Sequence, residues 1–375
     1  MTDISLVCSL ARDAATACAA ARAGVSRIQE LDLLNPMLFS EFGKETPDGL
    51  PPIKGHPCFG LGKGFSGAGK TVELGKEGLL PLLKNHKSAI EGAKNPALLL
   101  GLGDLFVEDM YYYDQATDQL PNDWAPSDMW QQKAHGIAYQ LTQQTGLNID
   151  LSAIYTLYGG HSTLGTMLSR AQALMLEQGH DLVILGSVDS LLEPKALVAS
   201  AGLGLMATDD NPVGFMPGEA SAFSLTRLDA NNTLQLSHVF SIAGLQSVEN
   251  GTNLEDETVP LGREMSALIR SSLQQAGVQN STDIKQVIVD HNGLEWHAYE
   301  WGNTLMRLQE HGISLDSATT VFPVISFGEI GSATGLASLA MAEQGYRRGY
   351  FKGATLVVLT SFNGHRTALV LTGNQ

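Results

Sequence analysis

Short apolar runs alternate with stretches of helical periodicity along most of the chain. Apolar runs of about four to eight residues bounded by turn residues are typical of buried strands, and apolar residues spaced three and four apart are typical of amphipathic helices. Strands that alternate with helices in this way indicate a layered α/β fold. The pattern predicts strands over 96–105, 151–160, 181–190, 218–228, 285–293, 354–362 and 365–373, and helices over 128–146, 161–180 and 331–350.

One combination of elements occurs twice. A helix of small residues that contains Glu-Gln-Gly near its end is followed by an apolar strand that ends in serine, once in 161–190 and again in 331–361. We therefore predict an internal duplication, with an N-terminal half over 1–229 and a C-terminal half over 230–375. Segments rich in glycine, proline and polar residues are predicted to be long loops, at 34–70 and 114–129.

The composition is that of an acidic globular protein. Of the 375 residues 43% are hydrophobic and 17% are charged, and the formal net charge is −16. This charge argues against nucleic acid and anionic membranes as general partners. No run of about 18 apolar residues predicts a membrane span, and no basic leader followed by an apolar stretch predicts a signal peptide. The 3 cysteines show no Cys-x-x-Cys spacing, so we expect a cytoplasmic location without a disulfide framework.

One short motif, GFSGAGKT at 64–71, matches the pattern of a phosphate-binding P-loop. In that interpretation Lys70 would reach the phosphates and Thr71 would hold magnesium. A P-loop requires a buried strand before its glycines, whereas the preceding residues, PPIKGHPCFGLGK, are rich in proline and glycine. We therefore favour a glycine-rich loop that leads into a core helix, and a nucleotide-binding protein is the third hypothesis for the function.

Three segments carry a resemblance to a known family. The segment 209–229 (DDNPVGFMPGEASAFSLTRLD) resembles the signature of the β-ketoacyl synthases, and 327–342 (FGEIGSATGLASLAMA) resembles the start of a glycine-rich helix in the same enzymes. The segment 64–83 resembles an early part of those enzymes, which gives the P-loop match a second explanation. The resemblance covers about 60–375 and implies the thiolase fold: two similar βαβ-rich halves in a five-layered α-β-α-β-α arrangement, usually dimeric.

The chemistry of that family uses a cysteine at a helix N-terminus, which takes the acyl group, and two histidines. Carried over by position, the resemblance places His161 at the cysteine, His291 at the first histidine and Glu329 at the second. The lysine expected in the stretch that holds Val324 and Ile325 is absent. Because a helix dipole disfavours a cation at the helix N-terminus, we expect His161 to be neutral.

Several interpretations of this residue set stay open. Ser162 could act as the nucleophile in place of its neighbour, with His291 or Glu329 as base. His161, His291 and Glu329 could instead form a facial triad for a divalent metal, or the set could be what remains of a lost active site. We predict neither a bound cofactor nor a resident metal from the sequence.

The absence of the cysteine, one histidine and the lysine favours a non-condensing, ketosynthase-like subunit, either chain-length-factor-like or regulatory. Such a subunit is expected to form a homodimer, or a heterodimer with a ketosynthase that keeps its cysteine. Acyl carrier protein or acyl-CoA would be its further partners, and an acidic carrier protein would need a local basic patch to dock. The alternative is an enzyme with altered His/Glu chemistry on an acyl thioester.

Overall fold

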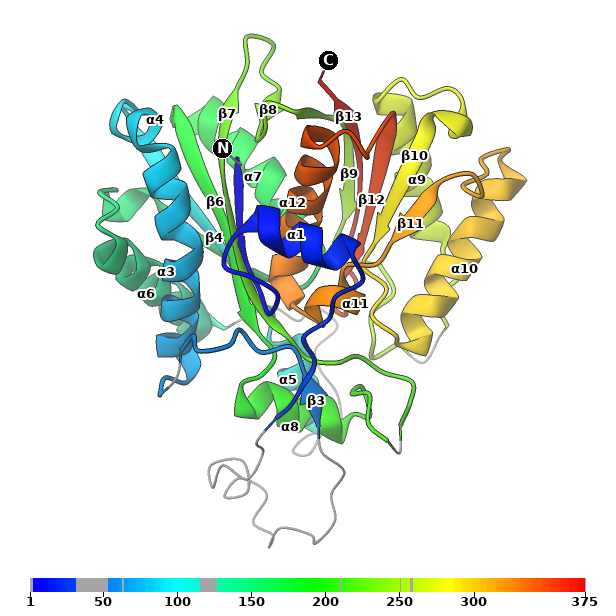
Figure 1. Cartoon of the computed structure of the whole chain (residues 1–375), viewed down its shortest axis with the longest axis horizontal. Coiled ribbons are helices and arrows are strands. Elements are labelled where there is room, and N and C mark those ends of the chain that lie inside the picture. The colour runs from blue at the N-terminus through cyan, green and yellow to red at the C-terminus, as the bar shows by residue number, and fades with distance from the viewer. Residues whose placement is uncertain are drawn as a thin grey trace, which may run out of the picture.

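The computed structural model describes residues 3–31, 53–62, 64–114, 127–209, 211–249, 251–256 and 259–374. In this part of the chain two larger β-sheets stand with helices between them and outside them (Figure 1). Of the two predicted loops, residues 34–52 and 115–126 lie outside the described residues.

The strands come from both ends and the middle of the chain. The first sheet has the order β5-β4-β6-β7-β1 and contains β1 (Ile4–Val7), β4 (Pro96–Gly103), β5 (Ile154–Gly159), β6 (Leu182–Ser190) and β7 (Glu219–Leu228), with β8 (Leu234–Gln235) paired to β7. The second has the order β11-β10-β12-β13-β9 and contains β9 (Phe240–Val248), β10 (Ile284–Val289), β11 (Thr319–Val321), β12 (Ala354–Thr360) and β13 (Arg366–Gly373). A small ribbon joins β2 (Gln29–Glu30) to β3 (Lys54–Gly55).

Both sheets have the same topology. In each, the first two neighbouring pairs are parallel and the last two are antiparallel. Ranked by their place in the sequence, the strands of either sheet follow the order third, second, fourth, fifth, first. The repeated topology confirms an α/β fold of two similar halves, whereas their boundary between residues 229 and 230 stays a prediction.

The helices complete five layers. Helices α7 and α12 lie between the two sheets, α3 and α6 cover the outer face of the first, and α9 and α10 cover the outer side of the second (Figure 1). This confirms the predicted α-β-α-β-α arrangement. The described helices are α1 (Ala14–Arg22), α3 (Gly67–Asn85), α4 (Lys87–Glu91), α5 (Phe106–Asp114), α6 (Asp128–Thr145), α7 (Thr163–Gln178), α8 (Pro194–Gly202), α9 (Arg263–Gln275), α10 (Glu295–Glu310), α11 (Val324–Phe327) and α12 (Thr334–Arg347).

The sequence of α12 explains its central position. Every residue from Thr334 to Gly345 is buried, and a helix that is buried on all sides must carry small or apolar residues all round. A Cβ atom at Gly335 would lie 2.5 Å from the Cβ atom of Leu164 on α7. Glycine at this position therefore allows the two central helices to approach each other closely.

The strand ends bring polar side chains together. Asp104 follows β4 directly, Asp189 lies near the end of β6, and His161 comes shortly after β5. Because β4 runs parallel to both β5 and β6, these three positions share one edge of the first sheet. Asp290 follows β10 in the second sheet.

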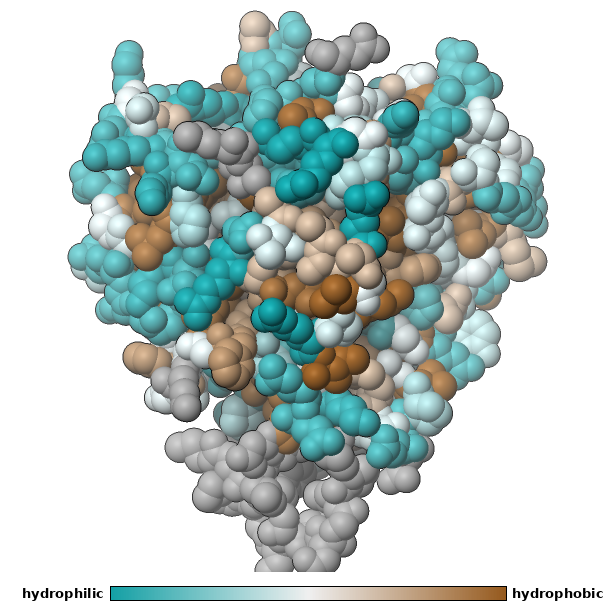
Figure 2. All heavy atoms as spheres, in the orientation of Figure 1, coloured by the Kyte–Doolittle hydropathy of each residue, from teal (hydrophilic) through white to brown (hydrophobic). Residues whose placement is uncertain are grey.

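The surface combines polar flanks with an apolar middle. Figure 2 shows the face that is turned to the viewer in Figure 1. Hydrophilic side chains cover both of its flanks, and apolar side chains gather across its middle, near α1 and α11. Exposed apolar residues include Val25 and Ile28, in the segment that follows α1, and Ile325 in α11. A membrane-crossing helix would have to be long and apolar, and none of the helices in the described ranges has both properties.

Candidate functional site

Three segments that lie far apart in the sequence meet at one buried cluster. His161 lies between the end of β5 and the start of α7, and Asp290 and Asn292 follow β10. Glu329 lies between α11 and a short 3-10 helix, Gly331–Ala333. Hydrogen bonds join His161 to Asp290 and to Glu329, and Asn292 to Glu329. We call His161, Asp290, Asn292 and Glu329 the histidine–carboxylate cluster.

His161 is held on both sides of its ring. Its Nδ1 atom lies 2.7 Å from Oδ2 of Asp290, and its Nε2 atom is hydrogen-bonded to Oε1 of Glu329. Burial disfavours the charged ring, but the negative charge of Glu329 and the hydrogen bonds that the ring donates to both carboxylates outweigh it and raise the pKa of His161 well above its ordinary value. The expectation of a neutral His161 was therefore wrong, because two carboxylates outweigh the helix dipole.

The carboxylates also accept hydrogen bonds from two main-chain N–H groups and from the side-chain amide of Asn292. The N–H of Gly331 donates to Oε1 of Glu329 at 2.9 Å, and Nδ2 of Asn292 donates to Oε2 at 2.6 Å. Burial alone would raise the pKa of Glu329, but the charge of His161 and these hydrogen bonds lower it. On the other side, the N–H of Thr360 donates to Oδ2 of Asp290. Both acids thus serve as hydrogen-bond acceptors in the cluster.

His291 lies outside this cluster. Its Nδ1 atom accepts the N–H of Gly293 at 3.2 Å, and its ring packs edge-on against the rings of Phe322 and His297. Burial lowers the pKa of His291, against the charge of Asp290. In the described part of the chain no hydrogen bond or ion pair joins His291 to His161 or Glu329. The structure therefore brings two of the three sequence-predicted positions together, and Asp290 and Asn292 complete the set.

Ser162 faces away from the cluster. Its hydroxyl donates to the carbonyl oxygens of Leu359 at 2.8 Å and His365 at 2.9 Å, and its N–H donates to Oγ of Ser361. The side chain is 1% exposed and ties the start of α7 to β12 and β13. A hydroxyl bonded in this way has a structural role. Within the described ranges no three His, Cys, Asp or Glu side chains are arranged to hold a metal ion.

In the P-loop-like motif, Lys70 and the N–H of Gly67 contact carboxylate groups of the same chain. Nζ of Lys70 lies 2.8 Å from Oε2 of Glu219 and 3.6 Å from Oε1 of Glu193. The N–H of Gly67, the first residue of α3, donates to Oε2 of Glu193 at 2.6 Å. These groups are the ones that a P-loop would offer to phosphate. The contacts favour the interpretation of a glycine-rich loop that leads into a core helix.

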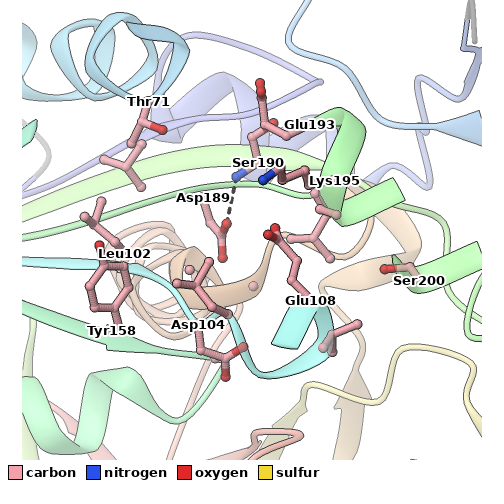
Figure 3. A pocket seen from close by; sticks show the side chains of 18 of the residues that line it. Thr71, Leu102, Asp104, Glu108, Tyr158, Asp189, Ser190, Glu193, Lys195 and Ser200 are labelled. Atoms are coloured by element: carbon pink, nitrogen blue, oxygen red, sulfur yellow. Dashed lines mark hydrogen bonds between the residues drawn. The ribbon is translucent and has the colours of Figure 1, made fainter. Parts of the chain in front are cut away.

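A cavity of about 580 Å³ opens beside the cluster, and His161 and Glu329 line it. Its wall combines apolar side chains with acids, and Figure 3 shows the carboxyl groups of Asp104, Glu108 and Asp189 around the same space. Pockets of roughly 300–1,000 Å³ hold small organic ligands. The apolar part of the wall is formed by Leu102, Leu105, Val107, Ile137, Val188, Leu191, Phe215 and Phe362.

Three of the acids that line the cavity have pKa values that burial raises towards neutral pH. Burial raises the pKa of Asp104 to about 6, against the charge of His161. Burial likewise raises the pKa of Asp189 to about 7, against the hydrogen bond from Ser332. Glu108 also rises to a pKa of about 7 through burial. Acids whose pKa values are raised in this way are typical of functional cavities.

Solved structures of known proteins share this architecture. The ishigamide ketosynthase/chain length factor matches with a TM-score of 0.69 at 16% identity, covering 100% of this chain and 99% of that one. The ketosynthase ApeO in complex with its chain length factor ApeC, from Xenorhabdus doucetiae, matches with a TM-score of 0.69 at 14% identity, covering 100% and 97%. The ketosynthase from module 6 of the bacillaene synthase of Bacillus subtilis 168 matches with a TM-score of 0.70 at 13% identity, covering 100% and 72%. The chain has the thiolase-like fold of the ketosynthases.

Sequence comparisons give no further match to this thiolase-like chain. The sequence models of known protein families do not match it, and a search of curated proteins finds no match either. The likeness therefore lies in the fold, and the site has to be interpreted from its own side chains.

Sequence reasoning missed four polar residues of this site. Asp290 and Asn292 flank the chosen His291, and Asp104 and Asp189 stand at the ends of predicted strands. A usable signal was present in the sequence, because an acidic residue follows or closes an apolar strand run in each of the three aspartate cases.

Proposed function

We propose that this chain is a non-condensing, ketosynthase-like subunit. The observation that carries the proposal is the state of His161, which stands at the start of α7 with both ring nitrogens bonded to carboxylates. An imidazolium donates from both nitrogens and has no lone pair left for attack on a thioester carbonyl. The position that the resemblance assigns to the acyl-accepting cysteine is thus filled by a group that cannot accept an acyl group.

The cysteines of the chain offer no substitute nucleophile. Each of the three is buried, and none of them lines the cavity within the described ranges. A buried thiol resists ionisation, and the thiolate is the reactive form. Burial raises the thiol pKa at every one of these positions, which are Cys8, Cys18 and Cys58.

The subunit part of the proposal is supported by the similar structures and by the topology. Two of the similar structures are named as a ketosynthase/chain length factor and a ketosynthase in complex with its chain length factor. In this chain β5 has a strand partner on one side only, β4, among the described residues. An edge strand can pair with a strand of another chain. We infer that a ketosynthase with an intact cysteine binds along β5, close to the turn that carries His161.

An acylation assay tests the non-condensing part. The purified chain is incubated with octanoyl-N-acetylcysteamine, and its intact mass is measured. We expect no acyl adduct on the wild type. The double variant His161→Cys/Glu329→His, which restores the two family residues at these positions, is expected to gain one octanoyl group. An octanoyl adduct of the wild type on the peptide that contains His161 would overturn the proposal, as would condensation with a malonyl thioester.

A pull-down tests the subunit part. The tagged chain is purified from its native cells and its partners are identified by mass spectrometry. We expect a stoichiometric ketosynthase that contains the condensing cysteine. A homodimer without such a partner would contradict the subunit part and leave the acylation result to stand alone.

A further inference from the structure

A second buried histidine, His297, lies in the first turn of α10, next to the wall of the cavity. Its ring stacks on the ring of Phe362, with 5.4 Å between the centroids and 16° between the planes. Phe362 lines the cavity. The ring of Trp296 lies 5.2 Å from the ring of His297. The first turn of α10 is thus joined to the cavity wall through a stack of aromatic rings.

Neither ring nitrogen of His297 has a partner. The side chain is 3% exposed, and in the described part of the chain Nδ1 and Nε2 make no hydrogen bond. A neutral imidazole has one donor and one acceptor, whereas an imidazolium has two donors and a charge. Burying the charged ring without a partner costs far more than burying the neutral ring. The packing therefore accepts His297 only in its uncharged form.

The surrounding charges oppose a proton on His297 as well. The ring centroid of His161 lies 5.8 Å away, and His161 is itself positively charged. The two carboxylates nearby are already paired, Asp290 with His161 and Glu300 with Arg366. The charged and titratable groups that face His297 are His161 before α7, Asp290 and His291 after β10, Glu300 on α10 and Arg366 on β13.

These contacts give His297 a pH dependence of known sign. Burial and the charges of His161, His291 and Arg366 lower the pKa of His297 well below its ordinary value of 6.5. A conformation in which the ring reaches water takes up a proton below that ordinary value, while the packed conformation does not. Each further pH unit therefore favours the open conformation by about tenfold, until the lowered pKa is reached.

We propose that Trp296, His297 and Phe362 form an acid-sensitive latch in the wall of the cavity. In neutral solution the uncharged ring of His297 holds the first turn of α10 against Phe362. In acidic solution the ring takes up a proton and moves to water together with this turn, which opens the cavity wall beside Phe362. Helix α10 lies on the outside of the molecule, where its first turn can move into solvent (Figure 1). The inference goes beyond the proposed function, because it concerns access to the cavity whether or not the chain condenses.

Hydrogen–deuterium exchange of the full chain tests the latch. Protection factors correct for the effect of pH on the intrinsic exchange rate, and the amides of residues 298–302 report on the start of α10. Between about pH 6.5 and about pH 5.5, we expect wild-type protection there to fall by about tenfold more than in His297→Phe. Phenylalanine keeps an aromatic ring in the stack but takes up no proton. The amides of α12 should stay protected, because the opening is local.

Two further variants make the result specific. His297→Gln also removes the titrating ring, and it should show the same loss of pH dependence as His297→Phe. The matched control is His311→Gln, which removes an exposed histidine just after the last residue of α10 and should behave like the wild type. Thermal melting at neutral pH shows that each variant is folded. The difference between wild type and variant isolates His297, because Asp290, His291 and Glu300 are present in both.

Three results would overturn the inference. The first is a fall of wild-type size in either His297 variant, which would assign the pH dependence to other groups. The second is wild-type protection at the start of α10 that does not change with pH. The third is an equal fall in α12, which would show that acid unfolds the whole chain and opens no local latch.

Discussion

Neutralising Glu329 tests whether the histidine–carboxylate cluster is a true buried ion pair. Glu329 is 1% exposed and His161 is 4% exposed. Removing one partner of a buried pair costs about 3–5 kcal/mol, because the other charge is left without compensation. In Glu329→Gln the amide keeps an acceptor for Asn292, and Asp290 still faces His161. We therefore expect the lower end of the range, a loss of about 3 kcal/mol in the free energy of unfolding.

A double-mutant cycle isolates the interaction itself. The variants are His161→Asn, Glu329→Gln and the pair, and the free energies come from urea unfolding midpoints at about pH 7 with a shared slope. We expect a coupling energy of about 2 kcal/mol that changes little with salt, because buried pairs are weakly screened. The control cycle uses Lys87 and Glu91, which are 72% and 66% exposed and 3.6 Å apart. That surface pair should couple by less than about 0.5 kcal/mol.

The pH dependence of the coupling energy between His161 and Glu329 can refute the assignment of a charged pair. A raised pKa of His161 means that its contribution is fully present below its ordinary value of 6.5 and is lost only as the pH rises through the raised value. A lowered pKa of Glu329 means that its contribution is present above 4.5 and is lost as the pH falls through the lowered value. The coupling should thus persist at about pH 8, where an ordinary histidine is neutral. A coupling that has vanished at that pH would refute the reasoning.

Three further predictions follow from contacts outside the cluster. Lys70→Ala should lower the free energy of unfolding by about 3 kcal/mol in urea melts, because it leaves the buried Glu219 without its cation; an unchanged midpoint would contradict the assigned pair. Ser162→Ala should lower the free energy of unfolding by about 1–2 kcal/mol in urea melts, because it removes the hydrogen bonds to Leu359 and His365; an unchanged midpoint would contradict the structural role of this hydroxyl. Iodoacetamide should leave the native protein unlabelled by intact mass and should label all 3 thiols after unfolding; rapid native labelling would contradict the burial of Cys8, Cys18 and Cys58.

The elements of this fold could be predicted because their signals are local. The apolar run of β4 and the small residues of α12 each reflect burial on every side, and burial of this kind leaves a pattern within a dozen neighbouring residues. The strand β9 was not predicted, because its polar and apolar residues, FSIAGLQSV, do not form a continuous apolar run.

Only part of the site could be predicted, because its chemistry depends on partners that lie far apart in the sequence. His161 was predicted at the start of a helix over 161–180 and lies in the turn just before α7, but its charge is decided by Asp290 and Glu329, which are 129 and 168 positions away. In the turn after β10 the choice of His291 missed by one residue on either side, since Asp290 and Asn292 face the cluster. Which side chain of a turn points inward is decided by tertiary packing; the acidic residue that follows the apolar run marks Asp290 as a candidate, but the pattern does not show that its partner is His161.

The protonation state of His161 is the central claim, and a histidine-selective ¹⁵N NMR titration measures it most directly. The resonances of His161 are assigned by their loss in His161→Asn. We predict that both ring nitrogens stay protonated at about pH 8, well above the ordinary pKa of about 6.5. A neutral ring at that pH, with one nitrogen unprotonated, would restore a lone pair at the start of α7 and contradict the account of a non-condensing subunit.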